Sequence, residues 1–238
     1  MPNPYFQFKQ FHIDQSGAAM KVGTDGVLLG AWAKMDGSER RILDIGTGTG
    51  LIALMAAQRC LSAGIDAVEI DETAACQAKE NIKRSPWPHR IEVYPVPVQD
   101  FIREDTMPYD HILANPPFFV DSLKAPDDLR TAARHADTLT FEDLVSSVSS
   151  MLAPAGLFSV IYPVVEAGLF QEVAEKKGLF CTRKTRVRGA PGKPFKRILM
   201  EFSRQEKPEP DNELTIELTR HRYSPEYREL TKDFYLRF

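Results

Sequence analysis

Several features are scarce or missing in this sequence of 238 residues. It has three cysteines, which are widely spaced and form no Cys-x-x-Cys pair, so neither a disulfide framework nor a zinc site is indicated. No apolar run approaches the length of a membrane-spanning helix. The first residues, MPNPYFQFKQFHID, lack the basic and then apolar pattern of a secretion signal. We therefore expect a cytoplasmic protein that binds no membrane and no metal.

Charge of one sign is not in large excess either, since the formal net charge is -3. A polyanionic partner would be disfavoured if that charge were spread evenly. The segment from 183 to 204, however, has one acid, Glu201, against these bases: Arg183, Lys184, Arg186, Arg188, Lys193, Lys196, Arg197 and Arg204. Such a segment is often only a solvated basic face, but it is also typical of a surface that binds nucleic acid.

Short apolar segments alternate with amphipathic ones along most of the chain. The predicted strands are 40–46, 63–71, 90–96, 109–114 and 156–163, and the predicted helices are 51–60, 73–84, 141–152 and 165–178. A further helix is expected over 23–33, with Thr24 and Asp25 as its cap. This alternation is typical of a parallel sheet that is covered by helices on both faces.

The pattern changes after residue 178 to two strand-like runs, 179–189 and 195–203, which predict an antiparallel hairpin at the C-terminal side of the sheet. The resulting fold class is α/β, doubly wound, with a mostly parallel seven-stranded sheet. A polar linker over 206–212, a strand-like run over 213–219 and a helix capped by Ser224 follow. We expect one domain, divided into a lead-in (1–35), a catalytic core (36–205) and a C-terminal extension (206–238).

The strongest motif is LDIGTGTG, residues 43 to 50, between the first predicted strand of the core and its helix. Glycines at 46, 48 and 50 allow a ligand to approach the backbone. A GxGxxG dinucleotide site would need glycine at position 51, where the chain has Leu51, and no GxxxxGK[ST] phosphate loop occurs. What remains is DxGxGxG, in which Asp44 suits a cofactor with a positively charged amino acid end.

With these residues the sequence resembles the class I S-adenosylmethionine-dependent methyltransferases, which have a Rossmann-like fold. The resemblance implies that Asp44, Gly46, Gly48 and Gly50 bind S-adenosyl-L-methionine, whose product is S-adenosyl-L-homocysteine. It also implies that Glu69, with Asp71 as the alternative, takes the ribose hydroxyls and that Asp100 meets the adenine amino group. Taken singly, Glu69 or Asp100 would be a solvated loop acid, but their ordered spacing after successive strands favours the functional interpretation.

The segment NPPF, Asn115 to Phe118, follows the strand predicted over 109–114. Taken alone it would most simply end that strand, because proline restricts the residue before it. On the same sheet edge as the glycine turn, it would instead present the Asn115 side-chain oxygen and the Pro116 carbonyl to an exocyclic amine, with Pro117 keeping the acceptors rigid. Phe118 would stack on a base, and Phe119 is expected to be packing.

The motif (D/N/S)PP(Y/F) is shared by methyltransferases that act on planar nitrogen, so three further stretches are needed to narrow the substrate. Residues 21–33, 129–144 and 220–238 resemble segments of the bacterial family that methylates the 6-amino group of the adenine 3′ of the anticodon in valine tRNA. The resemblance implies an enzyme whose partner is tRNA. We assign Thr24, Asp25 and Asn115 to the cofactor site as well, and we expect a monomer.

RNA phosphates require basic partners. The candidates, with Lys9 as a weaker addition, are Arg130, Arg134, His135, Arg186, Arg188, Lys193, Lys196 and Arg197. Three alternatives stay open: a glutamine methyltransferase acting on release factors, which needs no basic surface; an rRNA guanine 2-amino methyltransferase, which usually carries an added domain; and an RNA-binding module without activity, which would not need the intact motifs.

Overall fold

The computed structural model describes residues 4–16, 21–101, 107–117, 139–207 and 210–237. The strands are β1 (Tyr5–Gln7), β2 (His12–Asp14), β3 (Arg41–Ile45), β4 (Gly64–Val68), β5 (Ile91–Tyr94), β6 (Tyr109–Ala114), β7 (Leu152–Pro163), β8 (Phe180–Arg188), β9 (Arg197–Ser203), β10 (Asp211–Thr215), β11 (Glu217–Thr219) and β12 (Arg222–Tyr223). The helices are α1 (Thr24–Trp32), α2 (Leu51–Arg59), α3 (Glu72–Lys83), α5 (Phe141–Met151), α6 (Val164–Lys176) and α7 (Pro225–Thr231).

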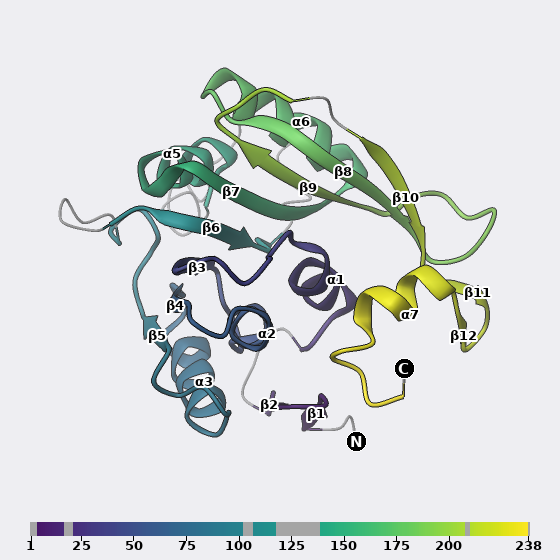
Figure 1. The fold of residues 1–238 in the computed structure, drawn as a ribbon, viewed down its shortest axis with the longest axis horizontal. Helices are drawn as coiled ribbons and strands as arrows, with labels where there is room; N and C mark the ends of the chain where they lie inside the picture. The colour runs from purple at the N-terminus through teal and green to yellow at the C-terminus, as the bar shows by residue number, and fades with distance from the viewer. Residues whose placement is uncertain (1–3, 17–20, 102–106, 118–138, 208–209, 238) are drawn as a thin grey trace, which may run out of the picture.

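The main sheet has the order β10-β8-β9-β7-β6-β3-β4-β5 (Figure 1). Strands β7, β6, β3, β4 and β5 are parallel, whereas β9 runs antiparallel to both β7 and β8. The seven predicted strands and the predicted antiparallel hairpin are therefore confirmed. An eighth strand, β10, pairs in parallel with β8. The run predicted over 213–219 is divided between β10 and β11, and β10 begins within the predicted linker.

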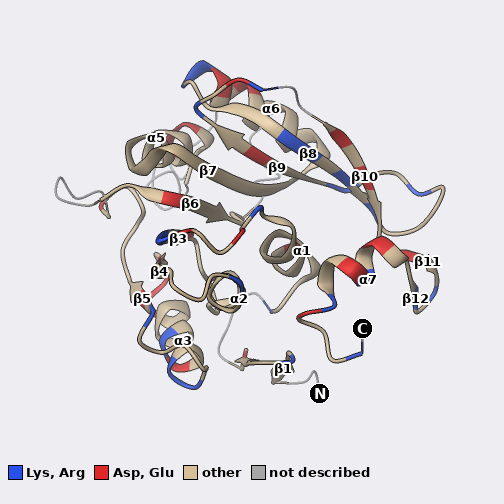
Figure 2. Cartoon of the chain, viewed as in Figure 1, with Lys and Arg blue, Asp and Glu red and all other residues tan. Residues whose placement is uncertain are grey.

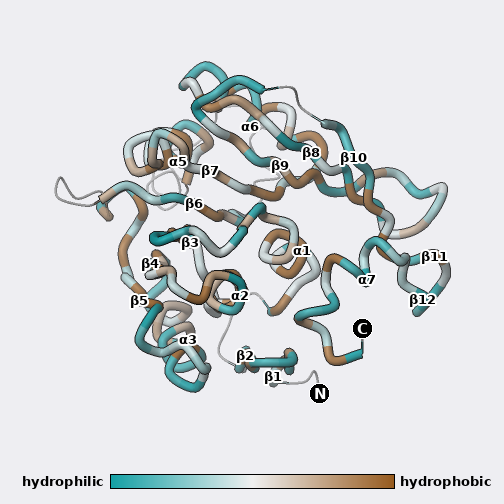
Figure 3. Tube along the Cα trace, in the orientation of Figure 1, coloured by the Kyte–Doolittle hydropathy of each residue, from teal (hydrophilic) through white to brown (hydrophobic). Residues whose placement is uncertain are grey.

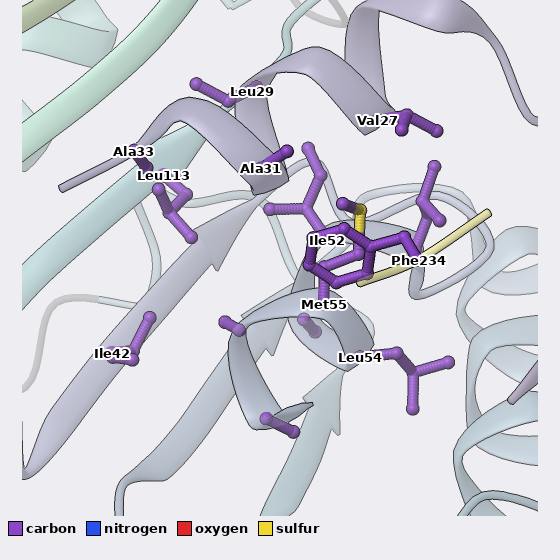
Figure 4. Packing of buried hydrophobic residues seen from close by; sticks show 14 of the residues in the cluster. Val27, Leu29, Ala31, Ala33, Ile42, Ile52, Leu54, Met55, Leu113 and Phe234 are labelled. Carbon is purple, nitrogen blue, oxygen red and sulfur yellow. The ribbon is translucent and has the colours of Figure 1, made fainter. Parts of the chain in front are cut away.

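The helices cover both faces of the sheet. One apolar cluster joins α1, α2 and α3 to one face, and a second joins α5 and α6 to the other face. In Figure 3, part of α1 is brown, and residues 26–32 of this helix are buried. Figure 4 shows Val27 and Leu29 of α1 above Ile52 and Met55 of α2, with Phe234 beside them. These contacts hold α1 on α2.

Local sequence explains where several helices begin. Thr140 and Asp143 form a reciprocal capping box at the start of α5. The predicted cap of α7 is confirmed, since Ser224 accepts a hydrogen bond from the Tyr227 amide and Pro225 is the first helical residue. The predicted cap of α1 is wrong. The helix begins at Thr24, its cap is Gly23 without a side-chain hydrogen bond, and Thr24 and Asp25 lie in the first turn.

The two ends of the chain pack against each other. Phe6 and Phe8 of the N-terminal segment lie with their ring centroids 6.1 and 6.0 Å from that of Tyr235. The Lys9 amide donates to the Phe234 carbonyl, and the Lys9 ammonium donates to the Lys232 carbonyl. Lys9, a weak candidate for an RNA contact, thus has a structural partner in the C-terminal extension.

Candidate active site

The strand register brings the motif residues to one edge of the sheet. Ile45, the last residue of β3, pairs with Val68 of β4 on one side and with Ala114 of β6 on the other. Gly46, Glu69 and Asn115 are therefore the first residues beyond three neighbouring strands. The chain order reverses between β3 and β6, where open α/β sheets bind their ligands.

The glycine turn between β3 and α2 has a conformation that side chains disfavour. Gly46, Gly48 and Gly50 have φ angles of +68°, +56° and +84°. The amides of Gly46 and Thr47 donate to the Val68 carbonyl, which fixes the turn against β4. A Cβ atom at Gly46 or Gly48 would meet no other atom within 4 Å, so the backbone faces open space that a cofactor can enter.

Asp44 lies directly below this turn and is fully buried. Its Oδ2 accepts hydrogen bonds from the Thr47 hydroxyl at 2.6 Å and the Ala53 amide at 3.1 Å, so it holds the turn to α2. Its Oδ1 has no hydrogen-bond partner within the described part of the chain. Burial raises the pKa of Asp44 to about 7, and the nearby Glu69 adds to the rise. A buried carboxylate with an oxygen to spare fits the positively charged amino end of the cofactor.

The acids after β4 and β5 differ in their engagement. Glu69 accepts hydrogen bonds from the Gly48 amide at 2.9 Å and the Asp71 amide at 3.0 Å, so it lies at the rim of the glycine turn. Asp71 caps α3 by accepting from the Ala74 amide. Asp100 is exposed after β5. Both acids accept backbone hydrogen bonds, and Glu69 is the better candidate for the ribose hydroxyls because it lies at the rim of the glycine turn, whereas Asp71 caps the next helix.

Asn115 and Pro116 continue β6 beyond the sheet edge. Asn115 is half-buried, Pro116 is buried and Pro117 is exposed, while Phe118 lies outside the described residues. The first turn of α1 covers Asn115, since a Cβ atom on Gly26 would lie 3.8 Å from the Asn115 Nδ2 atom and 3.0 Å from Leu51. The asparagine amide therefore lies between the glycine turn and the start of α1.

Thr24 and Asp25 lie in this first turn of α1 and have protein neighbours. Asp25 Oδ2 accepts a hydrogen bond from Arg197 Nε at 2.7 Å. Thr24 lines a groove between α1 and the C-terminal extension. Asp25 is thus already paired with a residue that we assigned to RNA.

The basic segment 183–204 is less positive in three dimensions than in sequence. Figure 2 shows the acidic residues of β10 beside the basic residues of β8. Arg186 pairs with Asp211 and Glu213, and Arg188 pairs with Glu213 and donates to Thr215. The partners Asp211 and Glu213 lie on β10, outside the segment 183–204, so they are not among the acids of that segment.

Two other arginines of the segment are also engaged. Arg183 pairs with Glu201 at 2.9 Å and stacks on Trp32, and the guanidinium of Arg204 donates to the Leu152 carbonyl. Lys193 and Lys196 are exposed, on the turn between β8 and β9. Arg130, Arg134 and His135 lie outside the described residues.

A groove that the sequence reasoning missed lies beside the start of α1. It has a volume of about 1290 Å³ and is lined by the N-terminal hairpin and the C-terminal extension. Its lining includes Phe6, Thr24, His221, Arg222, Tyr235 and Arg237. His221 has a φ of +63°, the one positive value at a residue other than glycine within the described ranges. In the sequence, this groove is indicated only by the many arginines and tyrosines over 220–237.

His111 is the buried histidine nearest to the motif along β6. Its Nε2 atom is 2.9 Å from the Ser159 hydroxyl, and burial lowers its pKa to about 3. It is therefore neutral under ordinary conditions and is enclosed in the core. Over the described ranges, no helix has the length and apolar character to cross a membrane, and no three potential metal ligands gather.

Comparisons with a family model and with full-length relatives both identify methyltransferases. The model of the methyltransferase small domain family matches residues 16–159. A tRNA1(Val) (adenine(37)-N6)-methyltransferase of Bacteroides fragilis is 51% identical over 241 residues, covering 100% of both chains. A protein of the same name from Trichodesmium erythraeum is 51% identical and covers 98% of both chains.

Solved structures of lower identity share the fold. A predicted O-methyltransferase of Agrobacterium tumefaciens has a TM-score of 0.67 and 20% identity, covering 88% of this chain and 96% of its own. The ribosomal protein L11 methylase of Lactobacillus delbrueckii has a TM-score of 0.59 and 17% identity, covering 82% and 84%. With its glycine turn and its Asn-Pro-Pro segment on one sheet edge, the chain belongs to the methyltransferase small domain family.

Proposed function

We propose that this chain is an S-adenosyl-L-methionine-dependent methyltransferase that modifies the 6-amino group of adenine 37 in valine tRNA. The observation that carries the proposal is the position of the Asn115 amide. It lies on the sheet edge next to the glycine turn, half-buried and covered by α1. The full-length relatives that share about half of the sequence supply the name of the substrate.

The cofactor is held by groups on three neighbouring loops. The backbone at Gly46 and Gly48 leaves room for its amino acid part, Asp44 offers a buried carboxylate oxygen, and Glu69 is placed to accept from the ribose hydroxyls. Asp100 is assigned to the adenine amino group. When bound, S-adenosyl-L-methionine supplies an electrophilic methyl group on its sulfonium.

Asn115 and Pro116 orient the substrate amine. The lone pair of an exocyclic amine is delocalised into the base, so the amine is a poor nucleophile. Two hydrogen bonds from its N–H groups, to the Asn115 side-chain oxygen and the Pro116 carbonyl, would fix the amine and direct its lone pair outward. Pro117 limits movement of these acceptors, and Phe118 is assigned as the stacking ring. His111 is enclosed in the core and burial lowers its pKa to about 3, so it is too inaccessible and too weak a base to accept the amine proton.

The RNA is bound by two surfaces that flank this edge. One is the exposed pair Lys193 and Lys196, with Arg186 and Arg188 held beside them by acidic partners. The other is the C-terminal groove, where cations such as Arg222 and Arg237 lie near the rings of Tyr223 and Tyr235. Cations and aromatic rings together suit an unpaired, stacked loop of RNA. Arg130, Arg134 and His135 are assigned to phosphates near the target, whereas Arg197 pairs with Asp25.

The three segments of the chain act as one catalytic unit. Phe8 of the lead-in and Phe234 of the extension belong to the same apolar cluster as Leu54 of the core. We propose that residues 1–238 form a single methyltransferase domain that works as a monomer in the cytoplasm. Sedimentation of the protein with and without tRNA measures the number of chains in the complex.

The test is to incubate the protein with methyl-labelled S-adenosyl-L-methionine and total bacterial tRNA and to identify the labelled nucleoside and its position. We expect N6-methyladenosine at position 37 of valine tRNA. A parallel reaction offers a release factor as the only substrate. Label in the release factor and none in tRNA would replace the proposal with a glutamine methyltransferase, and label on guanine would replace the target base.

A further inference from the structure

The ion pair between Asp25 and Arg197 joins two elements that meet above the catalytic edge. Asp25 is in the first turn of α1, and Arg197 opens β9. Arg197 pairs in register with Pro163, the last residue of β7, so it lies at the carboxyl end of that strand. The ion pair therefore spans from the sheet edge to the helix that covers Asn115.

The geometry of the pair is more restrained than that of most surface ion pairs. The Nε–Oδ2 distance is 2.7 Å, and the side chains are 30% and 25% exposed. Arg197 also donates through Nη1 to the Lys196 carbonyl at 3.0 Å. A guanidinium that is held at two positions can hold its carboxylate partner in a fixed place, which an exposed lysine would not do.

The first turn of α1 transmits this restraint to the site through Gly26. A Cβ atom on Gly26 would lie 3.0 Å from the Leu51 side chain and 3.8 Å from Asn115 Nδ2, so the absence of a side chain lets the helix backbone approach both. Leu51 follows the glycine turn, and Asn115 carries the amine acceptor. A shift of the first turn of α1 would therefore change the packing around both Leu51 and Asn115.

We propose that Asp25 and Arg197 are positioning residues, which lock the first turn of α1 over Asn115 so that its amide keeps the orientation needed for methyl transfer. Both residues were assigned from sequence to direct contacts, Asp25 to the cofactor and Arg197 to RNA. The inference rests on the proposed function and gives the two residues one shared role. Misplacing a catalytic group by about 1 Å can cost about 100-fold in rate.

The test compares Asp25→Asn, Arg197→Gln and the exchanged pair Asp25→Arg with Arg197→Asp. For each single variant we expect kcat for tRNA methylation to fall about 10-fold or more. The Kd of S-adenosyl-L-methionine by calorimetry and the KM of tRNA should stay within about two-fold of the wild type, because neither ligand loses a contact. The exchanged pair should recover most of kcat.

The matched control is Asp66→Asn. Asp66 pairs with Arg41 at 2.7 Å with side chains of similar exposure, 18% and 29%, and Arg41 begins β3 at the opposite edge of the sheet. We expect its kcat to be unchanged. Circular dichroism and the melting temperature show whether each variant folds.

Three results would overturn the inference. A wild-type kcat in Asp25→Asn would remove the positioning role. A large rise in the cofactor Kd of Asp25→Asn would show that Asp25 contacts the cofactor directly. A large rise in the tRNA KM of Arg197→Gln with normal kcat would show that Arg197 contacts the RNA directly. Two impaired single variants with no recovery in the exchanged pair would also contradict it.

An activity-independent measurement separates this inference from the proposed function. The side-chain amide signal of Asn115 in a ¹⁵N spectrum is identified by its loss in Asn115→Ala. We expect Asp25→Asn to shift that signal and Asp66→Asn to leave it in place. An unmoved signal would count against the positioning role of the Asp25–Arg197 pair. Wild-type protein that labels no tRNA would count only against the proposed function.

Discussion

The buried carboxyl of Asp44 makes a quantitative prediction about stability and pH. Its pKa is raised from 3.8 to about 7, mainly because burial disfavours the charged form. Between these two values the folded protein holds a proton that the unfolded chain releases. The stability of the wild type should therefore fall as the pH rises through this window, and Asp44→Asn should lack that contribution.

The magnitude follows from the two pKa values. By the linkage relation, the titration of Asp44 lowers the free energy of unfolding of the wild type by about 2.7 kcal/mol between about pH 5 and about pH 8.5. Asparagine keeps an acceptor oxygen for the Thr47 hydroxyl and the Ala53 amide, which both bind Oδ2 in the wild type. Its amide group takes the place of the unpartnered Oδ1 and would itself lack a partner, which costs about 1–3 kcal/mol at either pH.

The assay is denaturant unfolding of both proteins at the two pH values. The difference in free energy of unfolding, variant minus wild type, should rise by about 2.7 kcal/mol from the lower to the higher pH. Subtracting the wild type removes the contributions of the other titrating groups. A rise below about 0.5 kcal/mol would refute the reasoning, because Asp44 would then titrate as an ordinary exposed acid. Cofactor binding at pH 7 should release up to about half a proton, since a nearby cation lowers this pKa again.

Three further predictions concern the cofactor and RNA surfaces. Glu69→Gln should weaken S-adenosyl-L-methionine binding about 10-fold or more in calorimetry, because hydrogen bonds to a charged group are worth about 1.5–3 kcal/mol; an unchanged Kd would remove Glu69 from the site. Gly48→Ala places a side chain at a φ of +56°, so we expect a loss of about 1–2 kcal/mol in unfolding and weaker cofactor binding; unaltered values would mean that the turn tolerates side chains. His221→Gly should keep or raise the melting temperature, since glycine accepts a φ of +63°, while the KM for tRNA rises. A normal KM would exclude the imidazole from RNA binding.

The fold and the cofactor edge were largely predictable from sequence, because they depend on local patterns. Alternating strands and helices gave the parallel sheet, and the residues after β3, β4 and β6 were placed together at its edge. The engagement of individual charges was not predictable. Whether Arg186 is free depends on Glu213, which β10 brings beside it.

The groove at the C-terminal extension was not predictable for a similar reason. Its walls come from Phe6 and Thr24 near one end of the chain and Tyr235 near the other, so only the folded chain assembles it. The strained conformation of His221 also carries no simple sequence signal, because histidine adopts a positive φ only occasionally. The groove itself depends on packing between residues that are far apart in the sequence.

The most direct measurement of the central claim is the single-turnover rate of methyl transfer in Asn115→Ala, with saturating tRNA and cofactor. The claim is that the Asn115 side-chain oxygen orients the target amine. The variant should bind S-adenosyl-L-methionine with a nearly unchanged Kd and transfer the methyl group at least about 100-fold more slowly, as expected for the loss of one preorganised hydrogen-bonding group. A rate within about two-fold of the wild type would contradict the account, because orientation of the amine would then not depend on Asn115.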